Sequence, residues 1–265
     1  MPEGLSVHED QRVPGLRIEP DPLGVGWVMS LHGLEQSHVD LDEPWEVRHE
    51  YLRRIAAVLD SAWPVLAPIS ALHLGAGALT LPRYLHATRP GSAQVAVDHA
   101  PGLMEAVIAR LPLPPGTALA LRTGDAAAEL RALAEAGRRF QAIVVDIFTG
   151  PEAPAHVACA EFYADALGTL TPDGLLLVNV GDDDGLAFLD AQVREFLVAA
   201  QTVPGSSPVV LGDAHGLSLR RAGNAVLVAG PRLRNEPEAL MESWRRAGPH
   251  PAHVSLASAV LAGRG

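Results

Sequence analysis

From residue 70 onward, short apolar runs alternate along the chain with stretches of helical periodicity, and this alternation restricts the fold more than any other feature. The expected strands are 70–74, 93–98, 118–123, 141–148 and 174–180. The expected helices are 80–87, 102–110, 126–136, 158–170 and 185–201. Strands that each lead into a helix are typical of βαβ units. The sequence therefore predicts an α/β chain: a mostly parallel, twisted, Rossmann-like sheet with helices on both faces.

The two ends of the chain depart from this pattern. Residues 1–45 carry β-like runs at 16–20, 25–31 and 34–39 between turn-forming clusters, which predict a small hairpin or meander. A nucleoside-binding Rossmann-like domain with a C-terminal tail is expected over 46–265.

Three further segments complete the expected organisation. Helical spacing of apolar residues over 42–63 predicts a helix, with Asp42 and Glu43 near its start. Runs at 208–213, 217–221 and 224–230 predict closing antiparallel strands. The tail from 231 predicts a short helix and an apolar stretch without an assigned role.

Charge and composition exclude several classes of function. With 48% hydrophobic and 19% charged residues, the 265-residue chain can bury one sizeable core. The net charge of −11, and basic residues that are all Arg, argue against nucleic acid and favour a cationic small molecule. A single cysteine, Cys159, fits a reducing compartment, and no signal or membrane-spanning pattern occurs, so we expect a cytoplasmic protein without a membrane partner.

A glycine-containing turn follows the first strand of the expected sheet. Gly75 and Gly77 come directly after the run 70–74 and before the helix at 80–87. Glycine allows the backbone to approach a ligand closely, although packing alone also places glycine in such turns. Thr80 stands where a dinucleotide fingerprint carries its third glycine, which disfavours NAD.

Three carboxylates follow successive strands. Asp98 is placed to accept hydrogen bonds from ribose hydroxyls, and Asp125 from an adenine amino group. Asp146 ends a continuous apolar run at the carboxyl edge of the sheet. Helix capping by Asp98 and Asp125, and a turn at Asp146, are the alternatives. The candidate nucleoside-binding residues are Gly75, Ala76, Gly77, Asp98, His99, Gly124, Asp125 and Ala126.

Other polar clusters carry weaker signals. The three acids at 182–184 precede the helix at 185–201, where capping is the simplest interpretation, although they also lie at a strand end. The eleven His residues form no close pair with a third ligand, so no catalytic metal is expected.

The order and spacing of several blocks resemble the spermidine synthase family, the polyamine aminopropyltransferases, which share a class I methyltransferase-like Rossmann core. The resemblance covers about residues 16–230. Its blocks are LHGLEQS, RHEYL, LGAGALTLPRYL, VDHAPGLMEAV, TGDAAAEL, FQAIVVDIFTG, EFYADALGTLTPDGLLLVNV and GNAVLVAG. The resemblance implies S-adenosylmethionine or its decarboxylated form as co-substrate, a small β domain over the Rossmann domain, and a homodimer.

The resemblance also implies residue roles. Asp146 matches the carboxylate that helps remove a proton from the attacking amine. The positions implied for the lid and substrate channel are Gln36, Arg48, His49, Glu50 and Thr149.

Several positions depart from the family pattern. Ala78 replaces an Asp that holds the aminopropyl ammonium group, and Thr149 replaces a second acid after Asp146. Arg48 stands in place of an aromatic residue, and Ala96 precedes Asp98 where the family often has Glu-x-Asp. Loss of charge-assisted contacts weakens a diamine site, whereas Arg48 offers a partner for a carboxylate.

Three hypotheses follow. The first is a spermidine synthase-like transferase in which Asp146 is the candidate base for a small-molecule acceptor such as an amine. The second is a small-molecule methyltransferase in which Arg48 holds a carboxylate. The third is a catalytically silent homologue that binds a nucleoside or acts as a scaffold.

Overall fold

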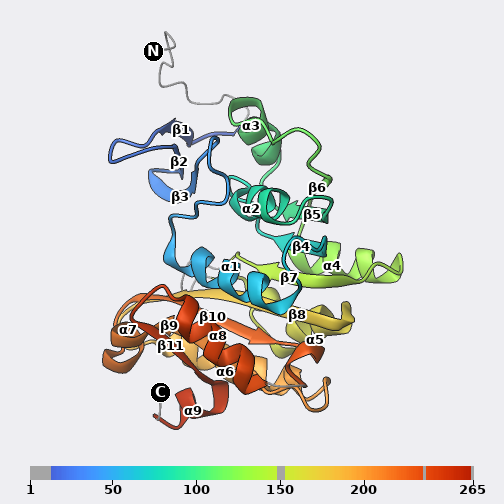
Figure 1. Cartoon of the computed structure of the whole chain (residues 1–265), viewed down its shortest axis with the longest axis vertical. Helices are drawn as coiled ribbons and strands as arrows, with labels where there is room; N and C mark the ends of the chain where they lie inside the picture. Colours follow the sequence, from blue (N-terminus) through green and yellow to red (C-terminus); the bar gives the residue numbers. More distant parts are fainter. Residues whose placement is uncertain (1–12, 148–152, 235–236, 264–265) are drawn as a thin grey trace.

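The computed structural model describes residues 13–147, 153–234 and 237–263, which form two sheets and the helices around them (Figure 1). The first sheet is an antiparallel meander of β1 (Leu16–Pro20), β2 (Trp27–Leu31) and β3 (Leu34–Val39). The second has eight strands in the order β11-β9-β10-β8-β7-β4-β5-β6.

Five neighbouring strands of the large sheet are parallel. They are β6 (Leu119–Thr123), β5 (Ala93–Asp98), β4 (Ser70–Leu74), β7 (Phe140–Val145) and β8 (Leu170–Asp182). The remaining three, joined antiparallel, are β10 (Gly223–Ala229), β9 (Val209–Asp213) and β11 (Ala252–Leu256). A mostly parallel sheet beside a small antiparallel sheet confirms the predicted fold class.

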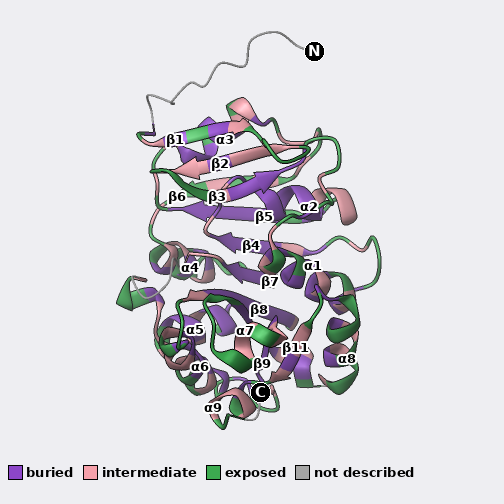
Figure 2. Ribbon diagram, turned by 90° about the vertical axis from the view of Figure 1, so that its left-hand side faces the viewer, coloured by how far each residue is buried: buried purple, intermediate pink, exposed green. Residues whose placement is uncertain are grey.

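Helices cover both faces of the large sheet, whose strands are mostly buried between them (Figure 2). One face packs on α1 (Glu50–Ala62), α2 (Thr80–Thr88) and α8 (Pro237–Ala247). The other packs on α4 (Ala126–Glu135), α5 (Ala160–Gly168) and α6 (Ala187–Ala200). Side chains alternate between the two cores along each strand: Ala142 and Val144 of β7 face the first, and Ile143 and Val145 the second.

The meander packs on α3 (Leu103–Arg110) and on the turn after β4. Met29 and Val39 share a buried apolar cluster with Leu103. The Oγ of Ser37 in β3 accepts a hydrogen bond from the Ala78 amide at 3.1 Å. The small sheet therefore forms one wall beside the strand ends of the large sheet. The division of the chain at residue 45 stays a prediction.

Two predicted segments differ in the structure. The helix expected from residue 42 begins at Glu50, because Asp40 Oδ1 accepts the amides of Asp42 and Glu43 and folds that stretch into a turn. The strand expected at 217–221 is wrong. Most of that segment belongs to α7 (Ala214–Leu219), whose first turn is capped by the Asp213 carboxylate.

The C-terminal tail is part of the main core. β11 extends the large sheet beyond β9, and α9 (Ala257–Leu261) follows it. Trp244 of α8 is buried, and its indole Nε1 donates to Ser61 Oγ of α1 at 2.7 Å. Over the described residues, no helix combines the length and apolarity that crossing a membrane requires.

The chain reverses its direction of winding between β4 and β7. β5 and β6 continue the sheet from β4, whereas β8 continues it on the other side from β7. At this point Gly75 has φ +90°, and a Cβ there would lie 2.2 Å from the Asp146 carbonyl oxygen. Gly75 is therefore required both by its backbone conformation and by the close approach of the two strand ends.

We expect Gly75→Ala to destabilise the fold more than Gly33→Ala does. Gly33, in the turn between β2 and β3, has a similar φ of +82° but open space around its Cβ position. The free energy of unfolding of the control should therefore fall only by the cost of a left-handed backbone conformation at an alanine, about 1–2 kcal/mol. Urea unfolding of both variants measures the difference. An equal loss of stability in the two variants would show that the close approach of Gly75 to the Asp146 carbonyl does not exclude a Cβ.

Candidate functional site

A cavity of about 470 Å³ lies at the carboxyl ends of β4, β5 and β7, and we call it the strand-end cavity. The meander and the start of α1 supply its other walls. The structure brings eight of the predicted site residues to this cavity: Gln36, His49, Gly75, Ala76, Gly77, Asp98, His99 and Asp146. Open α/β sheets bind ligands at such a switch point.

Asp146 lies at the centre of a hydrogen-bonded chain of side chains. Its Oδ2 accepts from the Tyr51 hydroxyl at 3.0 Å, and its Oδ1 accepts from Asn179 Nδ2 at 2.8 Å. Asn179 Oδ1 in turn accepts from Asn224 Nδ2 at 3.1 Å. Three residues from α1, β8 and β10 therefore hold one carboxylate, directly after β7, at the cavity wall.

Burial dominates the electrostatics of this carboxylate. Asp146 is partly exposed to the cavity but is surrounded by protein, and this burial raises the pKa of its carboxyl group. The hydrogen bonds from Asn179 and Tyr51 oppose the shift, since they favour the charged form. A carboxylate with a raised pKa beside a cavity is suited to accept a proton.

Tyr51 and Asn179 are functional candidates that the sequence analysis did not single out. Tyr51 was one of several residues at helical spacing, which also describes an ordinary core position. Asn179 is a polar residue inside the apolar run 174–180, and it is only 3% exposed. A buried polar residue in a continuous apolar strand needs a hydrogen-bond partner, and that signal was present in the sequence.

Asp98 holds the glycine turn in place. Its Oδ2 accepts from the Ala76 amide at 3.0 Å, and its Oδ1 accepts from the Ala100 amide at 2.9 Å. The N-cap of α3 is Gly102, four residues after Asp98, so Asp98 does not cap this helix. Ala96 belongs to an apolar cluster with Leu79 and does not line the cavity.

The third predicted carboxylate is used differently. Asp125 caps α4 by accepting from the Ala128 amide at 2.9 Å, and it contacts His156 Nε2 at 2.6 Å. Neither Asp125 nor its neighbours Gly124 and Ala126 line the strand-end cavity. The Gly124 amide nevertheless donates to the Asp98 carbonyl at 2.9 Å, so this turn adjoins the cavity. A role in binding adenine stays a prediction.

The remaining predicted channel residues lie around the start of α1. Arg48 points away from the cavity and donates to Asp21 Oδ2 at 2.8 Å, so its positive charge is already paired within the chain. Glu50 pairs with Arg54 at 3.3 Å. Thr149 lies outside the described residues.

A buried histidine forms part of the cavity wall. Burial lowers the pKa of His73 to about 4, while a hydrogen bond with Gln94 at 3.0 Å opposes the shift. His73 is therefore neutral near pH 7 and adds no positive charge. Glu35, Asp98 and Asp146 are the acids in the lining, and the described residues that form it include no Arg. The strand-end cavity is therefore suited to a cationic ligand.

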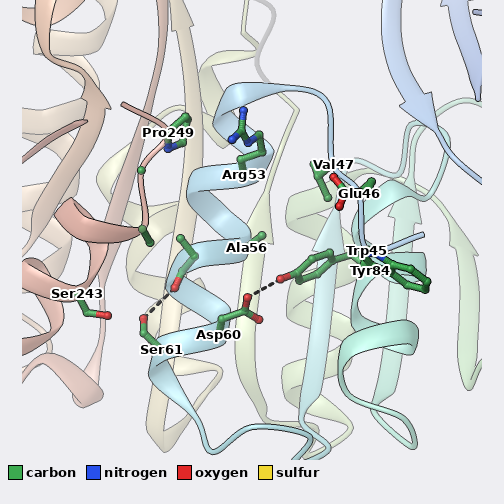
Figure 3. Close-up of a pocket in the computed structure, with 13 residues that line it drawn as sticks. Trp45, Glu46, Val47, Arg53, Ala56, Asp60, Ser61, Tyr84, Ser243 and Pro249 are labelled. Atoms are coloured by element: carbon green, nitrogen blue, oxygen red, sulfur yellow. Dashed lines mark hydrogen bonds between the residues drawn. The ribbon is translucent and has the colours of Figure 1, made fainter. Parts of the chain in front are cut away.

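Two further cavities lie along α1. One of about 400 Å³, here called the α1–α7 cavity, shares His49, Tyr51 and Asn224 with the strand-end cavity. The other, of about 470 Å³, lies between α1, Tyr84 and the segment around Pro249 (Figure 3). Three of its polar side chains are paired within the chain: the Tyr84 hydroxyl donates to Asp60 Oδ2 at 2.6 Å, and Ser61 Oγ accepts from the Trp244 indole. We call it the outer cavity, and none of the predicted site residues lines it.

The other polar clusters have structural partners. Asp182 accepts the Leu189 amide in the first turn of α6, and Asp184 pairs with Arg221. The Asp182 contact agrees with the capping interpretation, whereas Asp184 bonds the segment before β10 instead. Within the described part of the chain, no group of three His, Cys, Asp or Glu side chains is placed to hold a metal ion.

Solved structures with the same architecture identify the fold's relatives. A probable spermidine synthase from Corynebacterium glutamicum is 26% identical, with a TM-score of 0.75, over 92% of this chain and 88% of that one. A spermidine synthase in complex with the transition-state analogue AdoDATO is 17% identical, with a TM-score of 0.58, over 94% and 81%. Human methyltransferase-like protein 13 in complex with SAH is 20% identical, with a TM-score of 0.54, over 74% and 89%.

No protein-family model and no curated protein sequence matches the chain. The structural likeness nevertheless extends through both sheets, and it agrees with the order of sequence blocks from the meander to β10. The chain therefore resembles the spermidine synthases as a divergent relative, and it shares the Rossmann-like fold of the class I methyltransferases.

Proposed function

We propose that the chain transfers an alkyl group from an S-adenosylmethionine-type sulphonium donor to a small-molecule nucleophile, with Asp146 as the base. The observation that carries the proposal is the position of the Asp146 carboxylate, held by Tyr51 and Asn179 in the same cavity as Gly75 and Asp98. The complexes of related folds with AdoDATO and SAH support a nucleoside ligand of this type.

The proposed step needs little from the protein beyond position and one base. The lone pair of the acceptor attacks the carbon next to the sulphonium sulphur. The C–S bond breaks, its electron pair stays on sulphur, and a neutral thioether nucleoside leaves. The proton lost by the acceptor passes to the Asp146 carboxylate, directly or through water. Binding of both reactants in line supplies the rest of the rate enhancement.

The charges of the lining favour the decarboxylated donor. Its charged groups, a sulphonium and an ammonium, are both positive. The described lining of the strand-end cavity carries three acids and no Arg. A donor with a methionine carboxylate would meet these acids without a cationic partner, because Arg48 pairs with Asp21 outside the cavity. Methyl transfer from S-adenosylmethionine is therefore the second candidate.

A ligand panel tests the nucleoside site. Methylthioadenosine and decarboxylated S-adenosylmethionine should each raise Tm, by an amount that corresponds to about 2.7 kcal/mol at 100 times Kd. Thermal-shift scans with S-adenosylmethionine, S-adenosylhomocysteine and NAD complete the panel, and we expect NAD to have no effect. Stabilisation by NAD alone would contradict the proposal, and preference for the carboxylated donor would favour methyl transfer.

Asp146→Asn should remove turnover and increase stability at neutral pH. Because the folded-state pKa of Asp146 is raised, the stability this group contributes is fully present below its unfolded pKa and is lost as pH rises through the folded pKa. An Asn has no charge to bury, so Tm should exceed that of the wild type at pH 7, and the gap should narrow in acid.

Removal of a general base reduces rates by about 10²–10⁴-fold, which release of the thioether nucleoside with a panel of amines would measure. Asp60→Asn, at the Tyr84–Asp60 pair of the outer cavity, is the matched control and should keep full activity. Wild-type turnover by Asp146→Asn would exclude Asp146 as the base. No product from the wild type with any amine, despite nucleoside binding, would favour the silent homologue.

Tyr51→Phe should raise the pKa of Asp146 further. The Tyr51 hydroxyl stabilises the charged carboxylate and so lowers its pKa. Without this hydroxyl, less opposes the rise in pKa that burial causes. A ¹³C NMR titration of the labelled Asp carboxyl groups follows this change without an acceptor. Tyr84→Phe is the matched control and should leave the pKa of Asp146 unchanged. An unchanged Asp146 titration in Tyr51→Phe would show that the hydrogen bond is not formed in solution.

A further inference from the structure

The α1–α7 cavity is placed to receive a second reactant. It is formed by the first turns of α1, the start of α6, α7 and the beginning of β10. Its lining shares Tyr51 and Asn224 with the strand-end cavity, and both belong to the hydrogen-bonded chain around Asp146. A molecule in the α1–α7 cavity would therefore contact Tyr51, whose hydroxyl donates to the Asp146 carboxylate.

Arg54 is the unusual residue of this cavity. The residue is only 3% exposed, yet its guanidinium has one modest contact, from Nη1 to Glu50 Oε2 at 3.3 Å. Within residues 13–147, 153–234 and 237–263, the buried Nη2 has no hydrogen-bond partner. A buried guanidinium nitrogen without an acceptor is costly, and such groups are normally satisfied.

Glu50, the partner that the described part of the chain gives to Arg54, offsets its charge only weakly. The Glu50 side chain is 63% exposed, and an ion pair with an exposed partner contributes little. The two terminal nitrogens of a guanidinium match the two oxygens of a carboxylate, so a ligand carboxylate would satisfy Nη2 and replace or join Glu50 at Nη1.

The other charges of the cavity do not favour a diamine. Asp213 caps α7 through the Gly216 amide, and Arg221 at the rim pairs with Asp184. Both acids in the lining have partners within the chain: Glu50 pairs with Arg54, and Asp213 accepts from the Gly216 amide. Among the described residues, the charged group of the lining that still lacks a partner atom is the Arg54 guanidinium, and the buried Nδ1 of His49 is a second, uncharged one. The unsatisfied charge is thus positive, although the whole chain carries a net charge of −11.

Tyr51 and Arg54 are close enough on α1 for one small ligand to contact both. Tyr51 and Arg54 are three residues apart, so they lie on neighbouring positions of one helix face, with Cβ atoms about 5–6 Å apart. A short molecule can therefore place one end at Arg54 and the other beside the Tyr51–Asp146 pair.

We propose that the α1–α7 cavity binds the acceptor, and that the acceptor carries a carboxylate, held by Arg54, in addition to its nucleophilic amine. This inference rests on the proposed function, since it assigns the substrate class of the same reaction. An aminocarboxylate, rather than a diamine, is the acceptor class that fits the charges of the cavity.

A matched series of probes tests the proposal on the wild-type protein. ω-Aminocarboxylates of three to six carbons are compared with the diamines and the simple monoamines of the same length. Calorimetric titrations are performed with methylthioadenosine bound. We expect the best aminocarboxylate to bind at least tenfold more tightly than the best diamine or monoamine. Equal or tighter binding of the diamine would overturn the proposal.

Substitutions of Arg54 provide the second test. Arg54→Gln should weaken aminocarboxylate binding about tenfold or more and leave monoamine binding unchanged, and Arg54→Lys should recover part of the loss. Arg53→Gln is the matched control, because Arg53 is the exposed neighbour on α1 and faces the outer cavity (Figure 3). Equal weakening of both probe classes in Arg54→Gln would overturn the assignment.

Methylthioadenosine binding distinguishes failure of the proposed function from failure of the acceptor class alone. If methylthioadenosine does not bind to the wild type, the proposed function fails. If it binds normally but no aminocarboxylate outperforms its diamine, only the acceptor class is wrong. Retention of methylthioadenosine binding by Arg54→Gln would also show that this variant is folded.

Discussion

The placement of one carboxylate at the point where the sheet changes its direction of winding determines the rest of this site. Asp146 follows a strand whose neighbours are apolar, so its charge needs partners from outside that strand. They come from Tyr51 of α1 and Asn179 of β8, and Asn224 of β10 supports Asn179. The start of α1 and the antiparallel half of the sheet are thereby tied to the same carboxylate.

This arrangement divides the charges of the site between two adjoining cavities. Acids and no Arg line the described part of the strand-end cavity. Arg54, whose Nη2 has no partner among the described residues, lines the α1–α7 cavity. Tyr51 belongs to both. A cationic donor and an acceptor with an anionic group would be drawn to different sides of the same carboxylate, which suits a reaction between two substrates.

The sequence predicted the features that depend on topology and missed those that depend on individual side-chain contacts. Gly75, Asp98 and Asp146 lie together because the carboxyl ends of parallel strands meet at one edge, which strand positions alone indicate. The Tyr51 contact joins residues 95 positions apart, and helical spacing cannot reveal it. The run 217–221 was predicted as a strand from its β propensity, but its first part belongs to α7, because the Asp213 cap outweighs the propensity of so short a run.

A crystal structure of the complex with methylthioadenosine would show whether the reacting centre of the nucleoside lies beside Asp146. We expect the nucleoside in the strand-end cavity, with its ribose at Asp98 and its thioether sulphur facing the Asp146 carboxylate. A nucleoside bound elsewhere, or one that turns its sulphur away from Asp146 and Tyr51, would contradict it.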